Sequence, residues 1–229
     1  MGETAVIVNE LGEVAIDHHL LRRVDERTVL MKSGCLCCTL RGDLADELRD
    51  LLSRRERGEI PEFKRVVVET SGLADPTPIV YTLLSEPVVR HHYELEAIVA
   101  TVDAVNGLRL PESVKQAAVA DILVVTKTDL AGSRLLEERL ARLNPAAEIF
   151  EAQNGDVEPG RLFGRSQRDP RDLDFAEGPH EHDHGDVRAF SLFLDEELDW
   201  TAFGIWLTML LQSRGEDVLR VKGLLNVGG

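Results

Sequence analysis

Short aliphatic runs recur along roughly the first 150 residues of the chain, and charged or turn-forming residues bound each of them. Their length and composition predict buried strands, because a strand covered on both faces reads as a continuous apolar run. Between residues 40 and 52, leucines spaced three and four apart lie on one face of a helix. Strands alternating with amphipathic helices predict an α/β fold, in which helices cover both faces of a parallel sheet. The predicted strands are residues 4–10, 65–70, 95–104, 121–129 and 147–152.

The composition changes after about residue 155. Residues 155–186 are rich in glycine, proline and charge but lack periodic apolar positions, so we interpret them as a linker that contains a histidine-rich segment. Residues 187–229 predict a strand, a buried helix over 201–215 and a second strand over 217–229. Such a partial α+β unit buries little surface by itself, so we expect the domain to continue beyond Gly229. Residues 1–154 form the first predicted domain.

The size and composition of the chain limit the functions it can have. At 229 residues, the chain is long enough to bury a hydrophobic core without disulfide staples. Its formal net charge of −15 disfavours nucleic acid or anionic lipid as a partner, but it is compatible with divalent cations. The sequence shows neither a secretory leader nor an apolar stretch of membrane-spanning length. These features predict a cytoplasmic protein with no membrane partner, and a homodimer is one possible assembly.

All three cysteines lie in one short segment, residues 35–38. This odd-numbered cluster suits metal binding or thiol redox chemistry better than structural disulfides, and it indicates a reducing compartment. The thiolates of Cys35, Cys37 and Cys38 could bind zinc, with a carboxylate or a histidine as the fourth ligand. Gly34 would permit the irregular backbone that adjacent ligands require. The alternatives are buried cysteines that pack as small apolar residues, and a redox-active pair that closes a strained disulfide.

The segment VNELGEVAIDHHLL, residues 8–21, supplies further ligand types. Glu10 and Glu13 are candidate carboxylate ligands beyond the end of a predicted strand, and Gly12 allows the chain to turn sharply there. His18 and His19 are either auxiliary ligands or ordinary residues of an exposed helix or loop.

The segment RVVVETSGLADP, residues 65–76, is an aliphatic strand that ends in a carboxylate. In nucleotide hydrolases, a carboxylate at this place acts on magnesium or on its water shell, and small residues after it let the backbone approach the terminal phosphate. Glu69 and Gly72 occupy those places. The alternative is an ordinary strand end without a catalytic role.

The segment TKTD, residues 126–129, ends another predicted strand and suits a guanine base. Asp129 can accept hydrogen bonds from the ring and amino nitrogens of guanine, whereas the methylene stem of Lys127 can lie across the purine. Adenine presents the opposite hydrogen-bonding pattern to a carboxylate. Thr126 stands where such a motif usually has asparagine, so it keeps a hydroxyl group but lacks the amide.

These four segments, in this order and spacing, resemble the CobW-type GTP-dependent metallochaperones, a group that includes cobalamin-synthesis CobW proteins, zinc-transferring GTPases and nitrile hydratase activators. The resemblance extends over nearly the whole chain, and its most specific element is CxCC between the NExG and ETxG segments. It implies a fold like that of the phosphate-loop GTPases and a GTPase that delivers zinc or cobalt to a client metalloprotein or cobalamin-pathway enzyme. The implied cofactors are GTP, magnesium and the transported metal.

The resemblance also implies roles for particular residues. Cys35, Cys37 and Cys38 match the metal motif, and Glu10 matches a nearby acidic ligand or switch residue. The segment HEHDHGD, residues 180–186, resembles metal-collecting loops that precede the C-terminal domain, or it is a solvated loop without such a role. The remaining implied residues are Glu69 and Gly72 for magnesium and phosphate, Thr126, Lys127 and Asp129 for guanine, and His180, His182 and His184 for metal.

The sequence contains no GxxxxGK[ST] phosphate loop, since none of its five lysines follows a glycine. The resemblance implies a loop upstream of Met1, and the alternative is a truly truncated member of the family. We expect the present chain to hydrolyse GTP weakly or not at all, because the loop supplies most of the grip on the β and γ phosphates. Two alternatives stay open: a nucleotide-independent protein that stores or senses metal, and a thiol redox protein.

Overall fold

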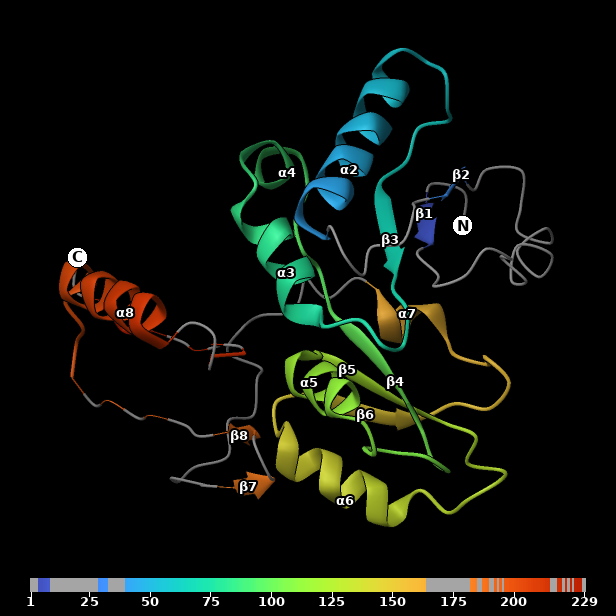
Figure 1. The fold of residues 1–229 in the computed structure, drawn as a ribbon, viewed down its shortest axis with the longest axis vertical. Helices are drawn as coiled ribbons and strands as arrows, with labels where there is room; N and C mark the ends of the chain where they lie inside the picture. The colour runs from blue at the N-terminus through green and yellow to red at the C-terminus, as the bar shows by residue number, and fades with distance from the viewer. Residues whose placement is uncertain are drawn as a thin grey trace. The chain divides into compact units, whose positions relative to one another are not determined.

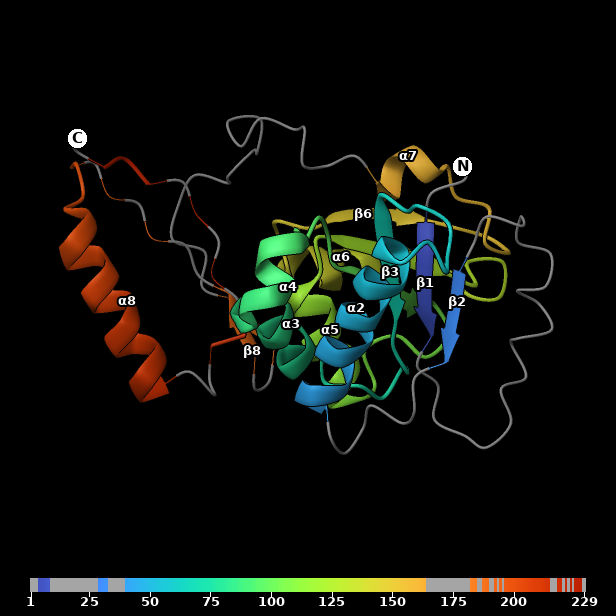
Figure 2. The same ribbon diagram turned by 90° about the horizontal axis from the view of Figure 1, so that it is seen from above.

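The computed structural model describes residues 4–8, 29–32, 40–163, 182–184, 187–189 and 196–214, together with positions 192, 194, 218–219, 221, 223 and 225–227. The chain divides into two compact units, residues 1–95 (unit 1) and residues 96–229 (unit 2). Figure 1 and Figure 2 show their elements in two views. Each unit contains a three-stranded parallel sheet packed against helices, so the predicted α/β class is confirmed.

The sheet of unit 1 has the strand order β2-β1-β3 and is parallel throughout. The middle strand pairs with both neighbours, and its last residue, Val8, lies opposite Lys32 on one side and Glu69 on the other. Figure 2 shows the three strands side by side. Two of them were predicted from their aliphatic runs, whereas the strand over residues 29–32 was not. The strands are β1 (Thr4–Val8), β2 (Val29–Lys32) and β3 (Arg65–Glu69).

Three helices follow in unit 1: α2 (Leu40–Glu56), α3 (Pro76–Ser85) and α4 (Pro87–His92). The start of α3 is specified locally, because the Asp75 carboxylate accepts from the Thr77 N–H at 2.9 Å and proline occupies the first helical position. Glu86 performs the same function for α4. The predicted leucine stripe of α2 is confirmed, since Leu44, Leu48 and Leu51 are buried against the sheet residues Ala5 and Ile7.

The sheet of unit 2 has the order β4-β5-β6 and is also parallel. The middle strand is buried over residues 122–125. One face packs against α5 and α6 through residues such as Ala117 and Leu140, and the other face packs against the segment that contains α7. All three strands lie within predicted ones. The elements are β4 (Val99–Asp103), α5 (Pro111–Val119), β5 (Ile122–Thr126), α6 (Arg134–Leu143), β6 (Glu148–Glu151) and α7 (Pro159–Leu162).

The C-terminal part of unit 2 differs from its prediction in two respects. The predicted helix is present as α8 (Trp200–Arg214), but none of its residues is buried. Its large apolar side chains, such as Trp206 and Met209, are exposed, because no described element covers them. In place of the predicted second strand, the described residues after α8 show only a bridge between Leu198 and Val227. Before α8, an antiparallel pair is formed by β7 (His182–His184) and β8 (Val187–Ala189).

Candidate functional site

Three sequence motifs begin where the strands of unit 1 end. The chain leaves β1 at Val8 toward Glu10, leaves β2 at Lys32 toward the cysteines, and leaves β3 at Glu69. Because these three strand ends lie opposite one another in a parallel sheet, the three motifs start from a single edge. Glu10, Cys35, Cys37 and Cys38 themselves lie outside the described residues, as does His180.

The ETSG segment is compatible with a phosphate ligand. Glu69 is exposed at the end of β3, and the turn after it is closed by the Ala74 N–H, which donates to the Ser71 carbonyl at 2.9 Å. A Cβ atom built on Gly72 would meet no atom within 4 Å. Packing against the described residues therefore does not require glycine here, and the space beside the backbone is open.

Helix α2, which begins two positions after Cys38, is anchored firmly to the rest of unit 1. Arg49 of α2 forms an ion pair with Glu86, the residue that joins α3 to α4. The Tyr93 hydroxyl donates to the Leu48 carbonyl of α2 at 2.9 Å, and burial raises the pKa of Tyr93 to about 12. The cysteine segment thus leads directly into a fixed helix.

In unit 2, the end of β5 holds Lys127 in an unusual conformation. Its φ of 57° lies in the left-handed region, which is costly for a residue with a side chain. The Lys127 carbonyl accepts from the Leu130 N–H at 3.0 Å and from the Ala131 N–H at 3.3 Å, so the chain turns tightly around Asp129. Asp129 is exposed in this turn, and Thr126 is partly buried at the end of the strand. The structure therefore presents Lys127 and Asp129 together.

The Lys127 ammonium group donates to the Asp103 carboxylate at the end of the neighbouring strand β4, with Nζ and Oδ2 2.5 Å apart. This contact holds the pKa of Asp103 well below its ordinary value, although partial burial acts in the opposite direction; the N–H groups of Val105 and Asn106 lower the pKa further. Our sequence reasoning missed Asp103, although it ends an aliphatic strand in a carboxylate as Glu69 does.

The end of β6 also reaches this turn. The Gln153 side-chain amide donates to the Thr128 hydroxyl at 3.2 Å, and the next residue, Asn154, has a positive φ of 51°. Gln153 was not singled out by sequence, because a polar residue after a strand is common. The ends of β4, β5 and β6 thus form one polar edge in unit 2, which contains Asp103, Lys127 and Gln153.

The predicted histidine site is only partly described. His182 and His184 belong to β7, where they lie opposite Ala189 and Val187 of β8. Residues 182–184 are therefore strand in this structure, although the sequence analysis placed them in a loop.

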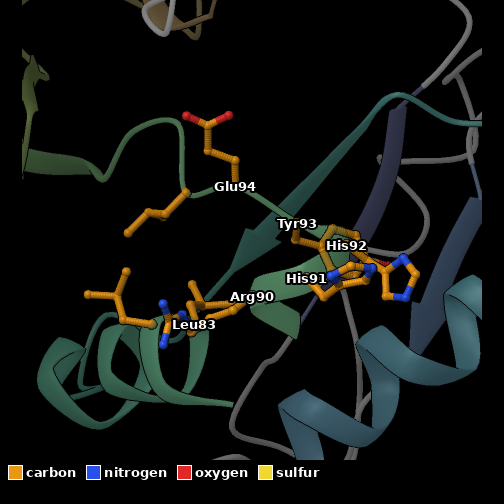
Figure 3. Close-up of a pocket in the computed structure, with 8 residues that line it drawn as sticks. Leu83, Arg90, His91, His92, Tyr93 and Glu94 are labelled. Carbon is orange, nitrogen blue, oxygen red and sulfur yellow. The ribbon is translucent and has the colours of Figure 1, made fainter. Parts of the chain in front are cut away.

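An open pocket of about 570 Å³ lies on unit 1 where α4 ends (Figure 3). Its lining includes His91 and His92, whose rings meet edge to face with centroids 4.8 Å apart. None of the predicted site residues lines this pocket. Nowhere in the described part of the chain do three histidine, cysteine, aspartate or glutamate side chains group as a metal ion would require. The helices described likewise include none with the length and apolar character needed to cross a bilayer.

Comparison with known proteins gives consistent matches along the chain. The family model described as "CobW/HypB/UreG, nucleotide-binding domain" matches residues 2–151, and that of the "Cobalamin synthesis protein cobW C-terminal domain" matches residues 187–229.

Individual relatives carry names of the same kind. The zinc chaperone YjiA of Escherichia coli is 34% identical over 236 residues, which cover 98% of this chain and 73% of the relative. The zinc chaperone CobW of a Sinorhizobium species is 26% identical, with the same coverage of 98% and 73%. Among solved structures, the crystal structure of the Zn(II)-bound YjiA GTPase from E. coli aligns with a TM-score of 0.61 at 27% identity and covers 93% of this chain and 70% of that one.

Proposed function

Because this chain belongs to the CobW/HypB/UreG nucleotide-binding family, as its sequence resemblance indicated, we propose that it is a GTP-dependent metal chaperone. It binds zinc or cobalt at the cysteine motif and delivers the ion to a client metalloprotein, with delivery coupled to GTP hydrolysis. The names of its relatives support zinc as the transported metal. The matched ranges support a GTPase-like domain over residues 1–154, a linker over 155–186 and a CobW-type unit from 187.

The observation that carries this proposal is the alignment of strand ends in unit 1. Val8, Lys32 and Glu69 lie opposite one another, and the chain runs from them into NELG, the cysteine segment and ETSG. A metal site and a phosphate site that start from one sheet edge share the same strands. A change in one segment can therefore reach the other through neighbouring backbone.

For the cargo metal, the ligands we propose are Cys35, Cys37 and Cys38, with Glu10 as the fourth. Three thiolates and one carboxylate suit an ion that must be released, because the carboxylate is the weaker ligand for a soft or borderline metal. The histidines His180, His182 and His184 would collect the ion before transfer.

For the nucleotide, we propose that Lys127 and Asp129 hold the guanine, with Thr126 supporting the turn. Glu69 contacts magnesium or its water shell, and Gly72 leaves room for the terminal phosphate. Magnesium, when bound, neutralises charge that develops on the phosphates during transfer. The exposed carboxylate of Glu69 and the open space at Gly72 fit these groups.

Zinc titration of the reduced protein against a competing chelator tests the proposal, with and without GTP and magnesium. A Cys37→Ala/Cys38→Ala double variant removes two of the four proposed ligands. A His91→Ala/His92→Ala variant is the matched control, because both histidines are exposed and lie outside the proposed site. We expect stoichiometric binding that the cysteine variant loses, the histidine variant keeps and GTP changes.

Other results point to the alternative functions. Cysteine-dependent binding that ignores GTP would favour metal storage or sensing without nucleotide. Binding that survives loss of the cysteines would contradict the metal site. Reversible loss of two thiols under mild oxidant, in a protein that holds no metal, would then favour redox chemistry.

A further inference from the structure

The Asp103 carboxylate is held in place by its own loop. Its Oδ1 accepts from the Val105 N–H at 2.7 Å and from the Asn106 N–H at 3.2 Å, and its Oδ2 accepts from the Asn106 side-chain amide at 3.2 Å. The Gly107 N–H donates to the Asp103 carbonyl at 2.6 Å. Gly107 has a positive φ of 52°, and a Cβ atom there would lie 3.3 Å from Leu136, so this loop needs glycine. The loop from Asp103 to Gly107 is thus folded around the carboxylate.

Lys127 is held by this fixed carboxylate. Asp103 lies opposite Thr126 in the parallel pairing of β4 with β5, so the Lys127 side chain must cross from one strand end to the next to reach Oδ2. Neighbouring strands are about 4.8 Å apart, which the methylene stem of a lysine can span. The ammonium group is therefore bound on β4 while the stem bridges the two strand ends.

Stability alone does not account for this arrangement. The Lys127 side chain is 54% exposed, and exposed ion pairs contribute little to folding. The backbone of Lys127 is nevertheless kept in a left-handed conformation that glycine would adopt at no cost. Strain of this kind persists only where the surrounding structure enforces it, and it is concentrated at active sites and ligand-binding segments.

We propose that Asp103 is the positioning residue of the guanine site, an inference that rests on the proposed function. By binding the ammonium group, Asp103 places the stem of Lys127 across the strand ends as a flat platform for the purine, beside Asp129. It also neutralises the charge of Lys127, which would otherwise attract phosphate groups to the place of the base. Asp103 thereby sets the position of the base and, through that position, the contact with Asp129 that distinguishes guanine from adenine.

The test is a titration of the full chain with GMP and with AMP, followed by NMR chemical shifts, and a parallel titration with tripolyphosphate. GMP has no β and γ phosphates, so its binding depends on the base site and not on contacts to those phosphates. Three variants are compared with the wild type: Asp103→Asn, which loses the charge; Asp103→Glu, which keeps it; and Lys127→Met, which keeps most of the stem but loses the ammonium group. The control is Glu138→Gln, which removes an exposed ion pair on α6.

We expect Asp103→Asn to lower the preference for GMP over AMP by about threefold to tenfold, which lies in the lower part of the range of coupling energies between contacting groups. Tripolyphosphate binding should not fall in this variant, whereas Asp103→Glu should retain part of the preference. Lys127→Met should lower the preference for GMP by a similar factor. The Asp103→Asn/Lys127→Met double variant should lower the preference no more than either single variant does. Circular dichroism checks that each variant is folded.

Two results would overturn the inference. In the first, the wild type prefers GMP, but a folded Asp103→Asn variant keeps the same preference or the losses in the double variant are additive. Asp103 would then not be a positioning residue, whereas the guanine site would still stand. A wild type without any preference for GMP would reject the guanine site and this inference with it.

Discussion

Replacing Asn144 by aspartate tests how unit 2 joins α5 to α6. Asn144 follows α6 and is 7% exposed. Its side-chain amide donates to three backbone carbonyl oxygens, those of Ala117 at 2.8 Å, Ala118 at 3.2 Å and Ala120 at 2.8 Å. These carbonyls lie at the end of α5, where the last turn has no donors of its own. One buried side chain thus caps a helix that packs on β4 and β5.

The magnitude follows from the contacts that are lost. Aspartate has nearly the shape of asparagine but no N–H group. The carbonyl oxygens therefore lose the hydrogen bonds from both amide hydrogens, and each loss costs about 1 kcal/mol of stability. An ionised carboxylate facing carbonyl oxygens adds about 1–3 kcal/mol. We therefore expect Asn144→Asp to lower the free energy of unfolding by about 3–5 kcal/mol at pH 7, out of a total of about 5–15 kcal/mol for a typical domain.

Urea unfolding followed by circular dichroism measures this loss. The introduced carboxyl group has a raised pKa in the folded state, because only its neutral form can donate to the carbonyls; the deficit should therefore shrink as the pH falls below about 6. The control is Asn154→Asp, which makes the same chemical change at an exposed residue. A loss below about 1 kcal/mol at pH 7, or a deficit that does not depend on pH, would show that Asn144 does not cap α5 as described.

Three further predictions concern the ion pairs and the partly buried Tyr93. Lys127 holds the pKa of Asp103 low, so the ionised Asp103 carboxylate stabilises the folded state above the ordinary carboxyl pKa, and this stabilisation is lost in acid. The difference in unfolding free energy between wild type and Asp103→Asn should therefore shrink between about pH 5 and pH 2. Glu86→Gln should lower the urea midpoint, because it weakens both the ion pair to α2 and the cap of α4, and an unchanged midpoint would contradict this. Tyr93→Phe should lower the unfolding free energy by about 0.5–1.5 kcal/mol through loss of the bond to Leu48, and it should abolish a phenol that titrates near pH 12 in ultraviolet absorbance.

Much of the fold could be predicted because it is specified by local patterns. The aliphatic runs predicted five strands, and each contains an observed strand, since a buried parallel strand must be apolar along its length. The strand over residues 29–32 was missed, because VLMK is short and ends in a lysine. Helix α8 was correctly predicted as a helix but wrongly predicted as buried. An apolar sequence shows that a helix would gain by packing against another element, but it does not show which element that is.

Some residues of the candidate site could likewise be predicted from the sequence, and others could not. The motif residues Glu69, Lys127 and Asp129 were chosen from sequence, because the chemistry of metals, phosphates and bases restricts which residue types can serve and at what spacing. Their roles stay predictions, and the cysteines lie outside the described residues. Asp103 could not be paired with Lys127 in advance, because the two are 24 positions apart and nothing local in either segment requires the other.

The sequence by itself determined the alternation of elements, the starts of α3 and α4 and the inventory of ligand types, because each depends on residues within a few positions of one another. Only the tertiary structure decided which strand ends share an edge, that Lys127 is bound by Asp103, and that Asn144 caps α5. Those contacts join segments that parallel pairing and helix packing bring together across 24 or more positions. Parallel strands meet only through long crossover connections, so their register, and the sites that it builds, is a property of the folded chain.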